Sequence, residues 1–302
     1  MEVKFNDCEI CGYNKWDAQF SGKIRDGAVG NFSNDESVIL RCSKCGVERL
    51  NESCCKDADL YTGKKYRQLL SQPTTAKGFL NKYDSLQLRN LKAIWPDSVR
   101  GKTVADIGCA AGSFLDHISG LTKEVIAVEP CSDYHYSLIN RGYSVYSYVN
   151  DAAGDWRGKV DYAFSFSVIK HISNPRLFLE EIGGMLSNNG KLLVSTPNRK
   201  DILMELAGDD YKRFFYRTVH RWYFDRKSFG YCADKAGFEV TRSICVHRFG
   251  LSNAMKWLRD SKPDENTPLP YLDDEVLDNF WKGYLESHGV GDYLYFELKR
   301  KE

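Results

Sequence analysis

Two short apolar runs separated by small residues stand out in the middle of the chain. Residues 103–107 (TVADI) and 125–128 (VIAV) are almost continuously apolar, which is typical of strands buried on both faces of a parallel sheet. The residues between them predict a tight turn followed by a helix. The stretch therefore forms a β-α-β unit, which opens a crevice at the carboxyl ends of its strands where nucleotides bind.

The same patterns predict further elements on both sides of this unit. Residues 142–149 (GYSVYSYV) read as a third strand, and residues 160–198 read as a strand, a helix and another strand. Residues 291–301 (GDYLYFELKRK) form a final alternating strand. Before the first strand, residues 61–98 carry apolar side chains at helical spacing, and Pro96 ends that stretch.

The turn after the first strand is built for close approach of a ligand. Gly108, Ala110 and Gly112 have little or no side chain, so a ligand can reach the backbone. Glu129 follows the second strand, roughly 20 residues on, where a carboxylate accepts hydrogen bonds from ribose hydroxyls. A dinucleotide site would have glycine at the positions of Ala110 and Ser113. The remaining alternative is an ordinary turn without a ligand.

Asp106 precedes Gly108 by two residues, so the motif reads D-x-G-x-A-x-G. It resembles the first motif of class I S-adenosylmethionine-dependent methyltransferases. The resemblance implies that the turn lies against the methionine part of S-adenosylmethionine, that Glu129 binds both ribose hydroxyls, and that Asp151 accepts from the adenine amino group. S-adenosyl-L-methionine is thus the expected cofactor. Its expected site comprises Asp106, Gly108, Ala110, Gly112, Glu129 and Asp151.

The resemblance covers roughly residues 100–245. His171 and the STPN run at 195–198 match the passage around strands 4 and 5, whereas Lys170 stands where the family usually has Glu. The implied fold is α/β, a Rossmann-like seven-stranded methyltransferase sheet with its last strand antiparallel. That strand should pair with residues 237–246.

Two copies of C-x-x-C-G lie near the start of the chain. Two residues between the cysteines let both thiolates reach one tetrahedral metal at about 2.3 Å, and the glycine suits a turn with positive φ. The pairs predict a structural Zn²⁺ in a zinc-ribbon-like module, with a redox or chance pairing as the alternative. The expected ligands are Cys8, Cys11, Cys42 and Cys45.

These features divide the chain into three regions. Residues 1–60 form the zinc-binding module and residues 61–100 a helical connector. Residues 101–302 form the Rossmann-like methyltransferase domain, with an insertion around 250–289.

The composition of the chain indicates which kinds of partner it binds and in which cellular compartment it resides. The 302 residues include 42 basic and 41 acidic side chains, which argues against a broad electrostatic grip on nucleic acid or an anionic membrane. No apolar run approaches the length of a membrane span, and the N-terminus lacks a signal-peptide core. Ten cysteines without a secretion signal suggest reduced thiols and metal ligands. We expect a cytoplasmic protein of undetermined oligomeric state.

Residues 211–229 (YKRFFYRTVHRWYFDRKSF) mix basic and aromatic side chains. They follow the fifth strand, so they should lie over the carboxyl edge of the sheet. Arginines bind phosphate and aromatic rings stack on sugars or bases, which predicts a pocket for an anionic acceptor. The alternative is an amphipathic segment with its aromatic side chains in the core. The acceptor-binding candidates are Tyr216, Arg217, Arg221 and Tyr223.

The whole layout resembles methyltransferases of sugar and surface-polysaccharide pathways. The resemblance implies a small-molecule or glycan acceptor such as a nucleotide-linked sugar. The related C-methyltransferases carry an additional C-terminal domain, so O-methylation is favoured. His171 and His220 are the candidate general bases, because an attacking hydroxyl must lose its proton. Two other hypotheses are an RNA-modifying methyltransferase that grips RNA with its zinc module, and a non-catalytic scaffold.

Overall fold

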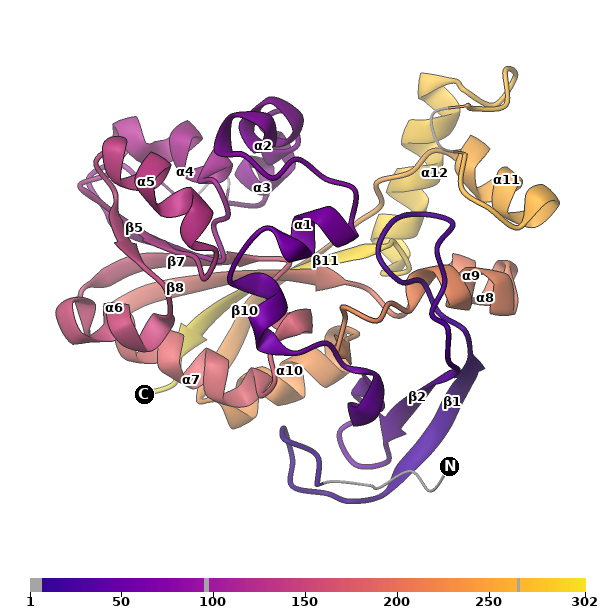
Figure 1. Ribbon diagram of the computed structural model, residues 1–302, viewed down its shortest axis with the longest axis horizontal. Helices are drawn as coiled ribbons and strands as arrows, with labels where there is room; N and C mark the ends of the chain where they lie inside the picture. Colours follow the sequence, from indigo (N-terminus) through magenta and orange to yellow (C-terminus); the bar gives the residue numbers. More distant parts are fainter. Residues whose placement is uncertain (1–6, 95–97, 265–266) are drawn as a thin grey trace.

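The computed structural model describes residues 7–94, 98–264 and 267–302, so Pro96 lies outside the described residues. Its centre is a seven-stranded sheet in the order β10-β11-β8-β7-β4-β5-β6 (Figure 1). β4 pairs in parallel with β5 and β7, whereas β11 is antiparallel to both β8 and β10. The strands are β4 (Thr103–Ile107), β5 (Glu124–Val128), β6 (Ser144–Tyr146), β7 (Val160–Phe166), β8 (Leu186–Pro197), β10 (Phe238–Val246) and β11 (Tyr293–Arg300). The predicted α/β fold class and antiparallel last strand are confirmed.

Helices cover both faces of this sheet (Figure 1). In β8, Leu192 and Val194 enter one core, whereas Leu193 between them enters the other, as the alternation of a strand requires. The helices of one face are α2 (Ala76–Tyr83), α3 (Gln87–Ile94), α4 (Ser113–Ile118) and α5 (His135–Asn140). Those of the other are α6 (Val149–Trp156), α7 (Pro175–Met185) and α10 (Arg226–Lys235).

The N-terminal residues form a small sheet whose fourth strand comes from a distant part of the chain. Its order is β1-β2-β3-β9, with β1 (Trp16–Gly22), β2 (Ser37–Cys42), β3 (Glu48–Leu50) and β9 (Trp222–Tyr223). Trp222 of β9 is buried, and its Nε1 donates to the carbonyl oxygen of Ile172, 2.8 Å away, in the segment that follows β7. One short strand therefore connects the small sheet to the edge of the large one.

The connector and the insertion are made of short helices. The connector contains α1 (Lys65–Leu69) besides α2 and α3, and two 3-10 turns, Glu52–Cys54 and Ala58–Tyr61, precede it. The Thr75 side chain caps α2 by accepting from the backbone N–H of Gly78.

After β8 come α8 (Leu203–Leu206) and α9 (Gly208–Phe215), and the insertion consists of α11 (Leu251–Asp260) and α12 (Glu275–His288). Ala254 and Trp257 of α11 pack in a third core with Phe20 of β1 and Phe215 of α9.

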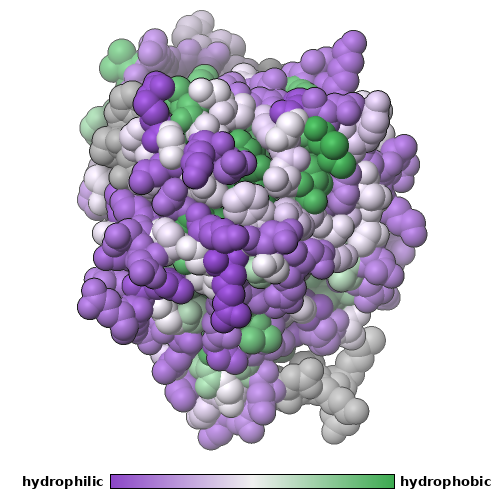
Figure 2. Space-filling view, turned by 90° about the vertical axis from the view of Figure 1, so that its left-hand side faces the viewer, coloured by the Kyte–Doolittle hydropathy of each residue, from purple (hydrophilic) through white to green (hydrophobic). Residues whose placement is uncertain are grey.

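The surface over the left side of Figure 1 is mainly hydrophilic, with small separate hydrophobic patches (Figure 2). Within the described ranges, no helix combines the length and the apolar character that a membrane crossing requires.

Candidate active site and cysteine cluster

The turn after β4 requires small residues for steric reasons. Gly108 and Gly112 have φ of +80° and +79°, which favours glycine, and Ala110 adopts φ of 50°. A Cβ atom at Gly108 would overlap the side chain of Val168, which follows β7. The glycine therefore lets the segment after β7 pack directly against the turn.

A cavity of about 550 Å³ opens at this carboxyl edge of the sheet. Its wall is formed by the connector, by the turns after β4, β5 and β7, and by the start of α6. Of the residues predicted from the sequence, it contains Gly108, Glu129, His171 and Arg221. Other lining residues are Lys56, Tyr61, Tyr66, Arg67, Ser147, Tyr148, Val149, Ser167, Val168, Lys170 and Glu181.

Glu129 holds the turn closed and faces the cavity. Its Oε2 accepts from the backbone N–H of Ala110 at 2.7 Å, and its Oε1 accepts from that of Cys131 at 2.9 Å. Burial raises the pKa of Glu129, against the effect of these two hydrogen bonds. Each carboxylate oxygen has a second lone pair, so it can also accept from a hydroxyl of a ligand.

Asp106 and Asp151 take different places from Glu129. Asp106 is buried within β4, and burial together with the charge of Glu129 raises its pKa to about 8. Asp151 is exposed, and its Oδ2 accepts from the backbone N–H of Tyr148 at 3.0 Å. Asp151 thus caps α6. Asp151 is not among the described residues that line the cavity. The lining at this point is formed by residues 147–149 instead.

The two histidines have unequal access to the cavity. Nδ1 of His171 lies 2.6 Å from the carbonyl oxygen of Val219, so Nδ1 carries the proton and Nε2 keeps a free lone pair. Burial and the charge of Lys170 hold the pKa of His171 well below its ordinary value, which keeps the ring neutral. His171 therefore lines the cavity in the form of a base.

His220 lies behind His171, with their rings edge to face and their centroids 5.1 Å apart. It is 4% exposed, and its Nε2 has no hydrogen-bond partner among the described residues. Burial, followed by the charge of Lys170, also holds its pKa well below the ordinary value. His220 is absent from the cavity lining as far as the structure describes it.

The aromatic and basic segment is mainly structural. The hydroxyl of Tyr216 donates to Glu48 Oε2 at 3.0 Å, and the hydroxyl of Tyr223 accepts from the backbone N–H of Arg217 at 2.9 Å. Both tyrosines belong to the third core. Arg221 reaches the cavity, but its Nη1 is paired with both carboxylate oxygens of Glu52 at 2.7 Å.

Sequence reasoning missed the contribution of the connector to the cavity. The side chains of Tyr61, Tyr66 and Arg67 line the cavity. The sequence of this segment indicated only helices and gave no sign of a binding role. Lys170 also lines the cavity. The sequence hinted at this, because a lysine stands where the resembled family usually has a glutamate.

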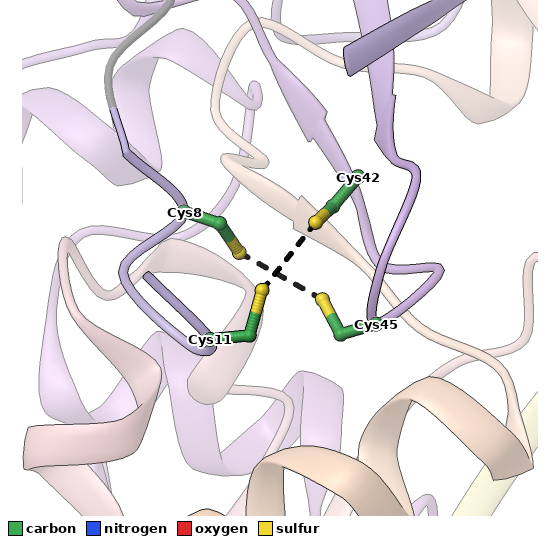
Figure 3. A group of neighbouring side chains, drawn as sticks. All are labelled: Cys8, Cys11, Cys42 and Cys45. Atoms are coloured by element: carbon green, nitrogen blue, oxygen red, sulfur yellow. Dashed lines mark hydrogen bonds between the residues drawn. The ribbon is translucent and has the colours of Figure 1, made fainter. Parts of the chain in front are cut away.

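The four predicted cysteines converge, and their sulfurs point toward a common centre (Figure 3). All four sulfurs lie within 4.8 Å of one another, and Cys8–Cys45 and Cys11–Cys42 are separated by 3.7 and 3.5 Å. Sulfurs around a tetrahedral zinc lie about 3.8 Å apart, as bonds of about 2.3 Å require. The following glycines have positive φ, 69° at Gly12 and 72° at Gly46, as predicted. The donor set fits zinc.

Comparison with known proteins agrees with the fold. The sequence model described as "Methyltransferase domain" matches residues 79–243. The chain belongs to this methyltransferase family. A chain of the solved complex that contains the Haloferax volcanii Trm112 methyltransferase activator superposes with a TM-score of 0.51 at 13% identity. The superposition covers 75% of this chain and 93% of that one. At this identity the likeness shows the fold alone.

Curated relatives include two proteins named ubiquinone biosynthesis O-methyltransferase. The one from Bradyrhizobium diazoefficiens is 30% identical over 147 residues, which are 44% of this chain and 55% of the relative. The one from Azorhizobium caulinodans is 26% identical over 149 residues, 46% of this chain and 56% of the relative. The chain thus spans about half the length of the relatives it matches.

The buried Asp106 predicts a pH dependence of stability. Its pKa is raised from 3.8 to about 8, so the folded protein retains a proton that the unfolded chain has already lost. Its contribution to the free energy of unfolding should therefore decrease from about pH 4 to pH 8, by about 1.4 kcal/mol for each unit of pKa shift. Urea unfolding over this range should show a shallower pH dependence for Asp106→Asn. The exposed Asp273→Asn should behave as wild type, and parallel curves for Asp106→Asn and wild type would contradict the assignment.

Proposed function

We propose that the protein is an S-adenosylmethionine-dependent methyltransferase that methylates a hydroxyl group of a small anionic acceptor. The observation that carries this proposal is the position of His171, which lines the same cavity as Gly108 and Glu129 and is held by a bond from Nδ1 to the carbonyl oxygen of Val219. A proton acceptor and a nucleotide-binding turn are thus combined at one edge of the sheet. The names of the curated relatives also support transfer to oxygen.

The cofactor would be held by the turn and by Glu129. Gly108 allows its close approach, Glu129 accepts from the ribose hydroxyls, and Asp106, Ala110 and Gly112 keep the turn in shape. Residues 147–149, at the start of α6, are placed for the adenine side, with Asp151 acting through the helix terminus. When bound, S-adenosylmethionine supplies an electrophilic methyl group.

The cavity residues would align the acceptor oxygen with the methyl group and take up its proton. Alignment provides most of the rate, because an oriented nucleophile reacts as though it were highly concentrated. Nε2 of His171 accepts the proton of the attacking hydroxyl, while the Nδ1–H bond to Val219 keeps the ring in place. Tyr61, whose hydroxyl lies 3.0 Å from Nδ1, supports the same orientation.

A sugar hydroxyl is the acceptor that this arrangement suits best, because an alcohol needs a base more than a phenol does. The names of the relatives point to ubiquinone biosynthesis and so favour an aromatic hydroxyl as the second candidate. Methyl transfer assays with nucleotide-linked sugars and with catechols separate the two.

We also infer that the cysteine cluster holds one structural Zn²⁺. Four thiolates would leave no open position on the ion, so the ion would stabilise the small sheet without taking part in the reaction. Through β3 and β9 that sheet also supports the wall of the cavity.

Replacement of Glu129 tests the cofactor site. Glu129→Gln removes the charged acceptor of the ribose hydrogen bonds, so S-adenosylmethionine should bind about tenfold more weakly or worse in calorimetry. Glu124→Gln is the matched control, because Glu124 is exposed at the opposite end of β5. Equal affinity of Glu129→Gln and wild type would refute the ribose assignment.

Replacement of the histidines tests the base. His171→Ala should lower turnover of a true acceptor by about 10²–10⁴ without loss of cofactor affinity, as expected when a general base is removed. His220→Ala should have the smaller effect on turnover, because His220 lies behind His171. Near-normal turnover in both variants would exclude a histidine base.

Replacement of a cysteine tests the metal. Cys42→Ser should lose the single zinc that elemental analysis finds per chain, and hydrogen exchange should show faster opening of residues 7–60. Cys54→Ser, outside the cluster, should retain it. Wild-type protein that contains no metal after gentle purification would disprove the zinc proposal.

A further inference from the structure

Lys170 is a buried lysine in the wall of the cavity, and its amine has no partner among the described residues. It is 8% exposed, and its Nζ makes no hydrogen bond or ion pair with any residue in the described ranges. The other cations of the wall have described partners: Arg221 pairs with Glu52, Lys56 lies 3.3 Å from Asp26, and Nη1 of Arg67 donates to the side chain of Gln72 at 2.7 Å. Lys170 is therefore free to bind a group that enters the cavity.

Two arginines near Lys170 also have no acidic partner in the part of the chain that the structure describes. Arg25 and Arg217 are joined by a backbone bridge, and in the described chain neither makes an ion pair. The Nε atoms of both are buried without a hydrogen-bond partner among the described residues. The Arg25 guanidinium lies over the ring of Phe214 at 4.0 Å, and Nη2 of Arg217 donates only to the carbonyl of Gly27, at 3.3 Å. Lys170, Arg25 and Arg217 are named here the cationic cluster.

This arrangement costs free energy in the absence of an anion. Buried polar groups are normally hydrogen-bonded and buried charges are normally paired. Burial, with the charges of Arg217, Arg248 and Arg25, holds the pKa of Lys170 well below its ordinary value, and no carboxylate offsets this effect. Arg248 is itself paired with Asp292, so it is not available to a ligand.

The acidic residues of the cavity belong to other parts of its wall. Glu129 is bound to the turn after β4, and Glu181 accepts from Asn150 of α6 at 3.1 Å. Lys170 is thus adjacent to His171, whereas Glu129 and Glu181 are bonded to other parts of the wall. An acceptor with a hydroxyl near His171 would present its own charge to Lys170.

We propose that Lys170 binds the anionic group of the acceptor, a phosphate or a carboxylate, while Arg25 and Arg217, which are not among the cavity-lining residues, lie behind it and add positive charge. This inference rests on the proposed function, since it concerns the acceptor half of the same cavity. It deepens that function by assigning the charge of the acceptor to a named side chain.

The test is anion binding to the complete protein with S-adenosylhomocysteine present. Inorganic phosphate and acetate are titrated separately by calorimetry, which distinguishes the two kinds of anionic group. At least one should bind wild type. Its Kd should increase about tenfold or more in Lys170→Met, because a charge-assisted contact is lost. Lys170→Arg should retain binding.

Lys123→Met is the matched control, because Lys123 is exposed beside the amino end of β5, away from the cavity. It should bind the anion as wild type does. Thermal unfolding in anion-free buffer provides a second measurement. Lys170→Met should unfold at or above the wild-type temperature, because a buried amine that has no partner among the described residues has been removed. Added anion should stabilise wild type more than Lys170→Met.

Three results would overturn the inference. The first is equal anion affinity of wild type and Lys170→Met. The second is a wild type that binds S-adenosylhomocysteine but no anion. The third is marked destabilisation of Lys170→Met in anion-free buffer. A wild type that fails to bind S-adenosylhomocysteine would instead refute the proposed function, so the two failures are distinguishable.

Discussion

The parallel pairing of β4 with β5 on one side and β7 on the other determines where the whole site lies. Because parallel strands end at the same edge, Gly108, Glu129 and the segment 167–171 meet there although they are far apart in the sequence. The absence of a side chain at Gly108 then lets Val168 pack against the turn. The cavity, the neutral His171 and the cationic Lys170 all depend on this alignment.

Buried ionisable side chains of this protein differ in whether they have a partner. Glu48, at the junction of the small and large sheets, is buried but accepts from Arg41 at 2.7 Å, Arg199 at 3.1 Å and Tyr216 at 3.0 Å. That charge is fully paired and serves the packing of β3 against β9. Lys170 is also buried but has no such partner among the described residues, which is the reason to assign it to an incoming ligand.

Local patterns were sufficient for the elements that short-range physics dictates. Continuous apolar runs identified β4 and β5, alternation identified β11, and the two C-x-x-C-G motifs identified the convergence of the cysteines. The antiparallel pairing of β11 with β10 came from the resemblance to methyltransferases and is confirmed. The same patterns did not reveal that β9 completes the small sheet, because a two-residue strand has no periodicity of its own.

The sequence by itself therefore determined the glycine turn after β4 and the two C-x-x-C-G motifs, because the residues of each motif act within a few positions of one another. Only the tertiary structure decided which side chains face the cavity. In the folded protein Tyr216 and Tyr223 pack in the third core, and Asp151 caps α6. Tyr61 and Lys170 lie in the wall of the cavity. The physical reason is that exposure and charge compensation depend on contacts between distant segments, which no local spacing encodes.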